Sequence, residues 1–242
     1  MLKRILLFFC IFVLIFSCNN NLNRSSKELF INAGEEPKTI DPTLSGNDFV
    51  YPRHVFETLI IKDKNGNLQG GACESWDISD DGLTYTFHLR ENAKWSDGFN
   101  VTANDFVYAL QRAANLASAA EYTSFVEYIK NAVKILSSEL PVEELGVKAI
   151  DDYTFEVELN SPTAYFLELA AYPPFYPVRE DIINEYGDEW TLKPKTYIGN
   201  GAFKMTERNF DKSIILERNT NYWNNENIKP NKLTFILMEE PN

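Results

Sequence analysis

Residues 72–108 read ACESWDISDDGLTYTFHLRENAKWSDGFNVTANDFVY, and this stretch carries the strongest structural signal in the chain. Within it, residues 84–89 alternate between polar and apolar side chains. Successive side chains of a strand point to opposite faces, so Tyr85, Phe87 and Leu89 would share one face. The alternation therefore predicts a half-buried strand, bracketed by turn sequences at residues 80–82 and 96–98.

A helix is expected directly after the second of these turns. Thr102 can cap its first turn, and Asp105, three residues later, can reach back to the free backbone amides. Apolar side chains then recur at helical spacing and would form one buried face. These are Phe106, Val107, Leu110, Ala113 and Ala114.

The rest of the chain mixes strand and helix patterns without strict alternation. A second helix is expected to carry Phe125, Ile129, Val133 and Leu136, and another to cover residues 180–186. Strands are expected at residues 29–33, 148–150, 154–159, 202–206, 213–217 and 232–238. Several of them would pair antiparallel, which predicts an α/β or α+β domain with a smaller inserted subdomain.

The charge of the chain restricts its partners. The 242 residues carry a formal net charge of −12, with 35 acidic and 23 basic side chains. Nucleic-acid binding requires concentrated Lys and Arg, so this balance argues against a nucleic-acid partner. It suits a protein that works outside the cytoplasm.

The N-terminus has the organisation of an export signal. Lys3 and Arg4 precede an uninterrupted apolar run at residues 5–16, which is too short to span a bilayer. The run leads into Ile15-Phe16-Ser17-Cys18, which resembles the bacterial lipobox. We therefore expect a signal peptide over residues 1–17, a lipid on Cys18, and a flexible tether over residues 18–28. The alternative is an ordinary cleaved signal in which Cys18 is incidental.

No combination of residues in the sequence indicates catalysis. His54 and His88 are the only histidines, and neither has a candidate nucleophile or base spaced around it. The acidic pairs at 80–81 and 151–152 occur where turns need residues that bond their own backbone. Cys73 reads as a small buried apolar residue. We therefore expect a protein that is not an enzyme and that has neither a cofactor nor a metal site.

Residues 72–108 closely resemble the signature of the oligopeptide-binding proteins of ABC importers, which are family 5 (cluster C) extracellular solute-binding proteins. That signature contains A-E-S-W, a strand ending in T-F-H-L-R, A-K-W-S-D-G and V-T-A-x-D-F-V-Y, in the same order and spacing. The resemblance extends through EPKTIDP at 36–42, LGVKAIDD at 145–152, GNGAF at 199–203, LERN at 216–219 and YWN at 222–224.

This resemblance implies a periplasmic-binding-protein-like (type II) α/β fold that closes over an extended peptide and delivers it to a membrane permease. Residues 29–57 and 180–242 would form lobe I, and residues 58–179 would form the inserted domain II. The chain corresponds to the N-terminal half of the family, so lobe III would be missing and the fold incomplete. Peptide capture could therefore be impaired. The alternative is a truncated surface lipoprotein that binds host or partner macromolecules without transport.

The resemblance also implies ligand contacts. Tyr122 follows Arg112 by ten residues, as a ligand-contacting tyrosine does in the family. Its alternative role is an aromatic residue that packs into the core. Ser45, Gly46 and Asn47 fall where a lobe I loop approaches the ligand in relatives. The expected partners are oligopeptides, ABC permease subunits and, through the N-terminal lipid, a bacterial membrane that holds the protein in the periplasm or at the cell exterior.

Overall fold

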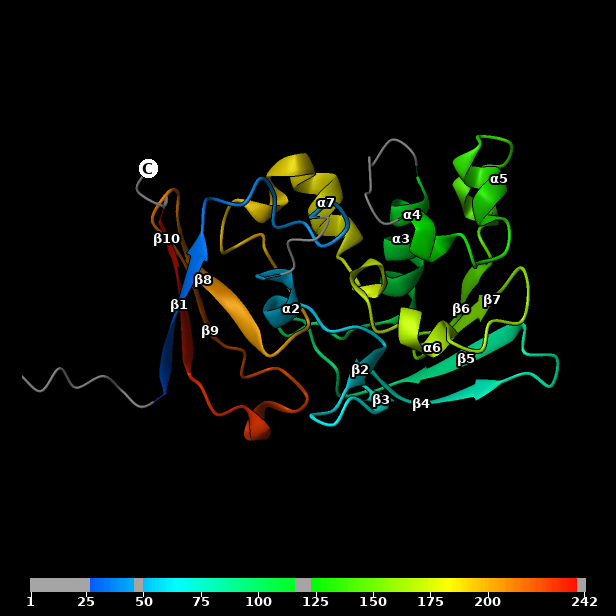
Figure 1. Ribbon diagram of the computed structural model, residues 1–242, viewed down its shortest axis with the longest axis horizontal. Helices are drawn as coiled ribbons and strands as arrows, with labels where there is room; N and C mark the ends of the chain where they lie inside the picture. Colours follow the sequence, from blue (N-terminus) through cyan, green and yellow to red (C-terminus); the bar gives the residue numbers. More distant parts are fainter. Residues whose placement is uncertain (1–26, 46–49, 116–122, 239–242) are drawn as a thin grey trace, which may run out of the picture.

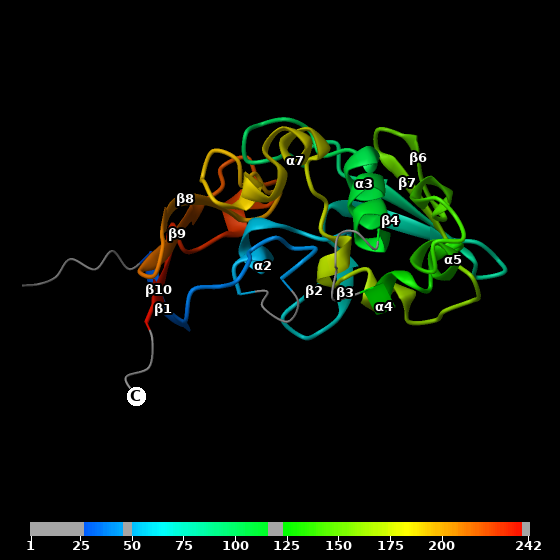
Figure 2. The ribbon, with the colours of Figure 1, turned by 90° about the horizontal axis from the view of Figure 1, so that it is seen from above.

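The computed structural model describes residues 27–45, 50–115 and 123–238 (Figure 1). Two four-stranded sheets lie toward opposite ends of the molecule and are joined by helices and loops (Figures 1 and 2). Among the described residues, no helix is long and apolar enough to cross a membrane. The mixture of sheets and helices confirms the expected α/β class.

The first sheet contains strands from both the N-terminal and the C-terminal part of the described chain. Its strands are β1 (Glu28–Gly34), β8 (Phe203–Asn209), β9 (Ser213–Arg218) and β10 (Lys232–Leu237), in the order β1-β10-β9-β8. β1 runs parallel to β10, with Leu29 opposite Leu233, whereas the other neighbours are antiparallel. The expected hairpin after residues 199–201 is confirmed as β8 and β9.

The second sheet contains the strand from which the sequence analysis started. It comprises β4 (Cys73–Ile78), β5 (Thr84–Leu89), β7 (Thr154–Glu158) and β6 (Val147–Asp151), in that spatial order and all antiparallel. Tyr85, Phe87 and Leu89 are buried on one face, as predicted. Helix α3 (Ala103–Ala114) covers that face, where the Phe106 ring lies 5.8 Å from the Phe155 ring.

Short elements connect the two sheets. Helix α2 (Pro52–Val55) leads into the small hairpin β2 (Ile60–Lys62) and β3 (Leu68–Gly70), which lies between them in Figure 1. The other helices are α4 (Thr123–Val126), α5 (Ala132–Leu136), α6 (Phe166–Leu169) and α7 (Glu180–Tyr186). The 3₁₀ helices are η2 (Val142–Glu144), η3 (Pro173–Phe175), η4 (Gly187–Thr191) and η5 (Asn225–Asn227).

The capping prediction is confirmed, whereas the prediction of one helix through Phe125 and Leu136 is wrong. Thr102 and Asp105 form the reciprocal capping box, with the Thr102 amide donating to the Asp105 carboxylate at 2.7 Å. The expected helix is divided into α4 and α5, because the residues between them leave the helical conformation: Ile129 forms a β-bridge with Leu159, and Asn131 is left-handed with φ of 67°. Val133, which one continuous helix was expected to place on its apolar face, is 58 % exposed.

Candidate functional site

Asp41 is the centre of the first buried polar cluster. Its carboxylate is only 4 % exposed and receives both ends of the Arg112 guanidinium, at 3.0 Å from Nη1 and 2.6 Å from Nη2. The Trp190 indole donates a third bond, at 3.1 Å. Bidentate, charge-assisted bonds of this kind fix orientation as well as adding energy. We call Asp41, Arg112 and Trp190 the Asp41 cluster.

The Asp41 cluster fixes the turn that leads to Ser45. The Asp41 carboxylate accepts the Thr43 amide at 2.9 Å, and the Asp41 carbonyl accepts the Ser45 amide at 2.8 Å. Just before the turn, the Tyr197 hydroxyl donates to the Ile40 carbonyl at 2.7 Å. Side chains more than 100 residues away in sequence therefore hold the backbone on the approach to Ser45.

Ser45 borders a hollow in the surface. The residue is 8 % exposed, and its hydroxyl has no hydrogen-bond partner among the described residues. A cavity of about 460 Å³ lies beside it, lined by parts of residues 33–39 and by residues 44 and 45. A buried hydroxyl without a protein partner costs free energy unless something else bonds to it. Ser45 therefore borders the cavity, but its hydroxyl oxygen is itself buried.

The same cluster joins the turn that ends at Ser45 to α3, the helix that precedes the predicted contact Tyr122 in the sequence. Arg112 is in the last turn of α3, so its bond to Asp41 brings the end of α3 next to the turn that ends at Ser45. Tyr108, one turn earlier, faces the charges of Arg112, Glu180 and Asp41, and burial raises its pKa. Of the predicted contacts, Ser45 is within the described part of the chain, and its role in ligand binding stays a prediction. Gly46, Asn47 and Tyr122, like the lipidation residue Cys18, lie outside the described residues.

A second polar cluster surrounds Glu57, which follows α2 at the junction between the sheets. Its carboxylate accepts hydrogen bonds from the Tyr222 hydroxyl and, at 2.6 Å, from the Trp223 indole. Asn200 bonds both the amide and the carbonyl of Glu57. Burial raises the pKa of Glu57 to about 7, although both hydrogen bonds and the nearby charge of Arg90 favour the ionised form. We call these residues the Glu57 cluster.

Arg90 extends the Glu57 cluster to the second sheet. Its guanidinium lies 3.8 Å from the centre of the Trp223 ring, and its Nε donates to the Gly71 carbonyl at 2.8 Å. Arg90 directly follows β5, whereas Trp223 follows the hairpin of the first sheet. The Glu57 cluster therefore fixes the relative position of the two sheets.

The two histidines and Cys73 make contacts that are typical of residues with a structural role. His88 contacts Asp77 at 2.8 Å on the surface, and the His54 ring packs against the rings of Phe203 and Phe235. Cys73 is buried and donates to the Leu59 carbonyl. Within residues 27–45, 50–115 and 123–238, no three His, Cys, Asp or Glu side chains are grouped closely enough to hold a metal ion.

The sequence analysis did not predict either cluster. Asp41 and Arg112 are 71 residues apart, and Glu57 and Tyr222 are 165 residues apart, so no local pattern links them. One signal was available, because Glu57 interrupts the apolar run VFETLI. A charge in such a run is expected to be buried with partners.

Comparison with known proteins agrees with this architecture. Residues 67–242 match the family model of the bacterial extracellular solute-binding proteins, family 5. The periplasmic oligopeptide-binding protein OppA of Salmonella typhimurium is 41 % identical over 209 residues, which are 85 % of this chain and 38 % of that protein. The dipeptide-binding protein DppE of Bacillus subtilis is 33 % identical, over 89 % of this chain and 40 % of that protein.

Solved structures show the same fold. Haemophilus influenzae OppA, in complex with the peptide RPPGFSPFR, superposes with a TM-score of 0.84 at 38 % identity, covering 90 % of this chain and 43 % of that one. The substrate-binding domain of an oligopeptide ABC transporter from Bacillus anthracis gives a TM-score of 0.85, covering 90 % and 42 %.

The chain thus spans about two fifths of the length of these relatives and has the corresponding part of their type II fold. Proteins of this family bind solutes and are not enzymes. The chain belongs to the family 5 bacterial extracellular solute-binding proteins.

Proposed function

We propose that this protein captures oligopeptides outside the cytoplasm for an ABC importer. The observation that carries the proposal is its 41 % identity to an oligopeptide-binding protein over 85 % of the chain. The Asp41 cluster supports it, because the cluster holds the approach to Ser45 against the end of α3. In this proposal, Ser45, Gly46, Asn47 and Tyr122 contact the peptide.

The proposal includes the domain arrangement and the anchor. Residues 29–57 and 180–242 would form lobe I, and residues 58–179 the inserted domain II. A lipid on Cys18 would hold the receptor beside its permease and raise its local concentration there. Recognition would rely mainly on the peptide backbone, in the manner of an added strand.

Peptide capture is tested by isothermal titration of the purified chain with an equimolar mixture of random pentapeptides. We expect saturable heat from the wild type, and at least a tenfold loss of affinity in Tyr122→Ala. The matched control Tyr165→Ala removes an exposed ring and should bind like the wild type. No heat and no thermal shift with the wild type would refute peptide capture and leave the partner-binding lipoprotein as the alternative.

The anchor is tested separately, by labelling cells that express the full chain with radioactive palmitate. The label should be incorporated into the wild type and into the control Cys10→Ala. It should be absent from Cys18→Ala, which would instead be found in the soluble fraction. Equal labelling of Cys18→Ala and the wild type would exclude Cys18 as the lipidated residue.

A further inference from the structure

The Glu57 cluster places a titratable carboxyl at the junction between the two sheets, and the proposed function does not use it. Glu57 is 7 % exposed, and Asn200 bonds both its backbone amide and its carbonyl. The Tyr222 hydroxyl and the Trp223 indole donate to the carboxylate, and the Arg90 guanidinium stacks on the Trp223 ring. The carboxylate is therefore one link in a chain of contacts that runs from the first sheet to the second.

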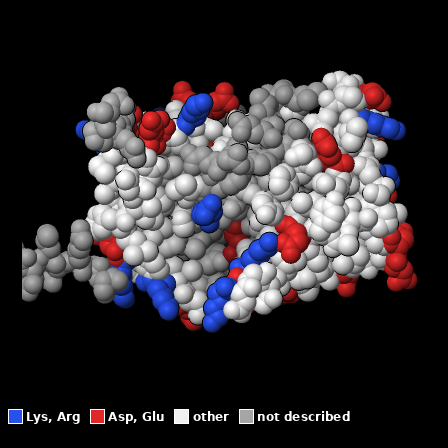
Figure 3. All heavy atoms as spheres, in the orientation of Figure 1, with Lys and Arg blue, Asp and Glu red and all other residues white. Residues whose placement is uncertain are grey.

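A hollow in the surface reaches the Glu57 cluster. It opens between α2, β2 and the segment around η3, has a volume of about 540 Å³, and is lined in part by Glu57 and Tyr222. We call it the η3 pocket. Figure 3 shows it near the middle of the face, with acidic atoms in its depth and basic side chains on either side. A displacement of Tyr222 would therefore expose the Glu57 carboxylate to solvent through this pocket.

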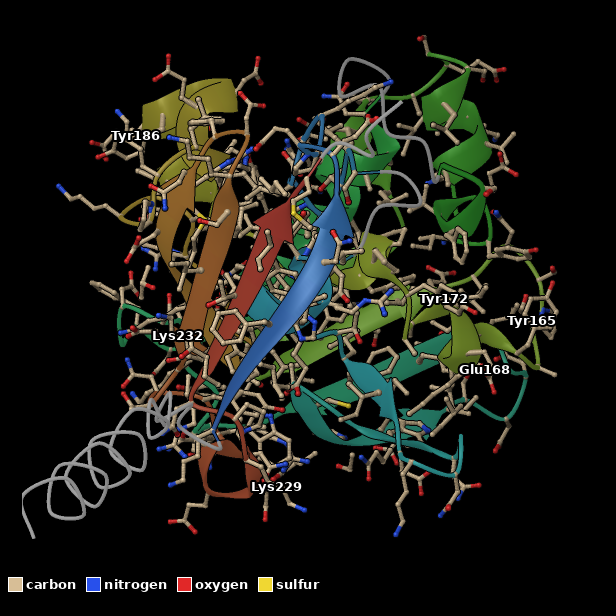
Figure 4. All side chains as sticks on the ribbon, turned by 60° about the vertical axis from the view of Figure 1, so that its left-hand side comes forward. Tyr165, Glu168, Tyr172, Tyr186, Lys229 and Lys232 are labelled. Atoms are coloured by element: carbon tan, nitrogen blue, oxygen red, sulfur yellow. The ribbon has the colours of Figure 1, made fainter. Side chains whose placement is uncertain are left out.

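The mouth of the η3 pocket is fixed by contacts that do not involve Glu57. Lys62 pairs with Glu168 and lies 6.0 Å from the centre of the Tyr172 ring. Figure 4 shows Glu168 and Tyr172 on the same side of the molecule. The bond to Glu168 raises the pKa of Lys62, so Lys62 stays charged at neutral pH.

The neutral titratable groups that face Glu57 keep their protons near neutral pH. Burial raises the pKa of Cys73 on β4 to about 12, and that of Tyr176, which follows η3, to about 12. Burial and the charge of Glu57 also raise the pKa of Tyr222. Glu57 differs from them, because burial raises its own pKa to about 7.

The positively charged groups around Glu57 are equally constant. Arg90 approaches it from the end of β5, and guanidinium groups stay protonated in proteins. Arg53, on α2, lines the η3 pocket together with Lys62. His54, also on α2, becomes charged only near pH 4, because burial and the charge of Arg53 lower its pKa to about 4. Of the described groups that face Glu57, the Glu57 carboxyl is thus the one that titrates near neutral pH.

Two further bonds across the junction involve no titratable side chain. The Ser96 amide donates to the Gly199 carbonyl at 2.8 Å, and the Asn221 side-chain amide donates to the Ser96 carbonyl at 3.2 Å. Ser96 lies between β5 and α3, whereas Gly199 and Asn221 flank the hairpin of β8 and β9. These bonds do not depend on the charge of Glu57 and give the junction a fixed point.

We propose that the junction between the two sheets is a pH-sensitive joint, which loosens when Glu57 loses its proton. An ionised carboxylate in this position is a charge removed from water, and solvent entering through the η3 pocket would restore part of its hydration. Tyr222 and Trp223 would move away from Glu57, and Arg90 would lose its stacking partner, while the bonds of Ser96 act as the pivot. The inference does not rest on the proposed function, because it concerns the chain without a ligand.

The size of the effect follows from the two ionisation constants of Glu57. In the loosened form the carboxyl would regain its usual pKa of 4.5, against about 7 in the closed form. The ratio of loosened to closed molecules should then rise about tenfold for each pH unit between 4.5 and 7 and level off above pH 7. The total change is at most about 300-fold.

The test follows the four tryptophan rings of the full chain, labelled with 5-fluorotryptophan, by fluorine NMR. The difference in chemical shift between light and heavy water measures how far each ring is exposed to solvent. For Trp223, this difference should increase as the pH rises from about 5 and should level off above about 7. Trp190, which donates to the buried Asp41 carboxylate, is the internal control and should not change.

Three variants complete the test. Glu57→Gln keeps the size of the side chain but cannot ionise, so its Trp223 ring should stay as little exposed at every pH as that of the wild type at about pH 5. Glu74→Gln, the matched control, removes an exposed carboxylate from β4 and should keep the wild-type profile. Arg90→Gln uncovers the Trp223 ring and supplies the reference value for the loosened joint.

A Trp223 ring in the wild type whose exposure is constant over this pH range would overturn the inference, and that result does not require Glu57→Gln to fold. The same Trp223 profile in Glu57→Gln and the wild type would also overturn it, as would an equal change at Trp190. Circular dichroism melts establish that each variant is folded at the pH values compared. No measurement uses a peptide, so failure of peptide capture would leave the result intact.

Discussion

Replacing Glu57 by glutamine removes a titrating group from the interior of the Glu57 cluster and should change how stability depends on pH. Burial raises the pKa of this carboxyl from the usual 4.5 to about 7, so the folded protein holds a proton that the unfolded chain releases. The resulting stabilisation is complete below pH 4.5 and is lost as the pH rises through 7. Each tenfold change in an ionisation constant corresponds to about 1.4 kcal/mol, so the loss amounts to about 3 kcal/mol.

His54 acts in the opposite direction over nearly the same range. Burial, assisted by the charge of Arg53, lowers the pKa of His54 from 6.5 to about 4. Its contribution to stability is therefore complete above pH 6.5 and is lost as the pH falls through 4. Because the side chain is partly exposed, we discount its contribution to about 2 kcal/mol. In the wild type, the two residues largely cancel between pH 4.5 and 6.5.

Urea unfolding followed by tryptophan fluorescence, at constant ionic strength and at several pH values from about 4 to 8, separates the two contributions. Relative to the wild type, Glu57→Gln should be more destabilised at pH 4.5 than at pH 8, by about 3 kcal/mol. His54→Phe keeps an aromatic ring against Phe203 and Phe235 and cannot gain a proton. Its stability relative to the wild type should improve by about 2 kcal/mol between pH 7 and pH 4.

The control for charge alone is Glu74→Gln, which removes an exposed carboxylate from β4. Its difference from the wild type should change by less than about 0.5 kcal/mol over this range. A Glu57→Gln difference that is equally independent of pH would refute the argument that burial governs this carboxyl. It would mean that the hydrogen bonds from Tyr222 and Trp223 offset the cost of burial.

Three further substitutions test the packing. Arg112→Met leaves the Asp41 carboxylate buried without its ion-pair partner and should lower the free energy of unfolding by about 3–5 kcal/mol in urea titrations. The double variant with Asp41→Asn should recover part of this loss. Fully additive losses from the two substitutions would contradict direct pairing of the two side chains. Asp105→Ala removes the capping box of α3 and a 3.3 Å bond from Trp95, so it should cost about 1–2 kcal/mol; an unchanged melting temperature would count against the cap. Gly199→Ala would place a methyl group 2.1 Å from the Val55 carbonyl oxygen and should lower the free energy of unfolding by about 1–3 kcal/mol in the same assay. A variant as stable as the wild type would show that the two backbone segments can move apart at little cost.

Helices and strands were predictable where residues close together in the sequence form a recognisable pattern. Residues 84–89 form a strand because their alternation matches the pleat, and residues 180–186 form the expected helix α7. The capping box was predictable because its partners, Thr102 and Asp105, are three residues apart. The division between α4 and α5 was not, because the left-handed Asn131 lies inside a pattern that otherwise fits one helix.

The polar clusters could not be predicted because their partners meet only after folding. Asp41 and Arg112 each lie in a recognisable motif, but nothing local pairs them. The cluster around Glu57 joins a linker after α2 to residues beyond β9. In both cases, a buried charge requires partners, and only the fold supplies them. Ser45 is the one proposed ligand contact whose surroundings the structure describes.

The central claim is that peptide is held where the turn ending at Ser45 meets the end of α3. Hydrogen–deuterium exchange of the chain with and without saturating RPPGFSPFR, the peptide bound by the Haemophilus influenzae relative, tests it directly. The account predicts slower amide exchange at residues 44–50 and 115–123 when peptide is present, with the exposed edge strand β6 unchanged as an internal reference. Peptide binding that slows exchange only elsewhere, or no slowing at any residue, would contradict it.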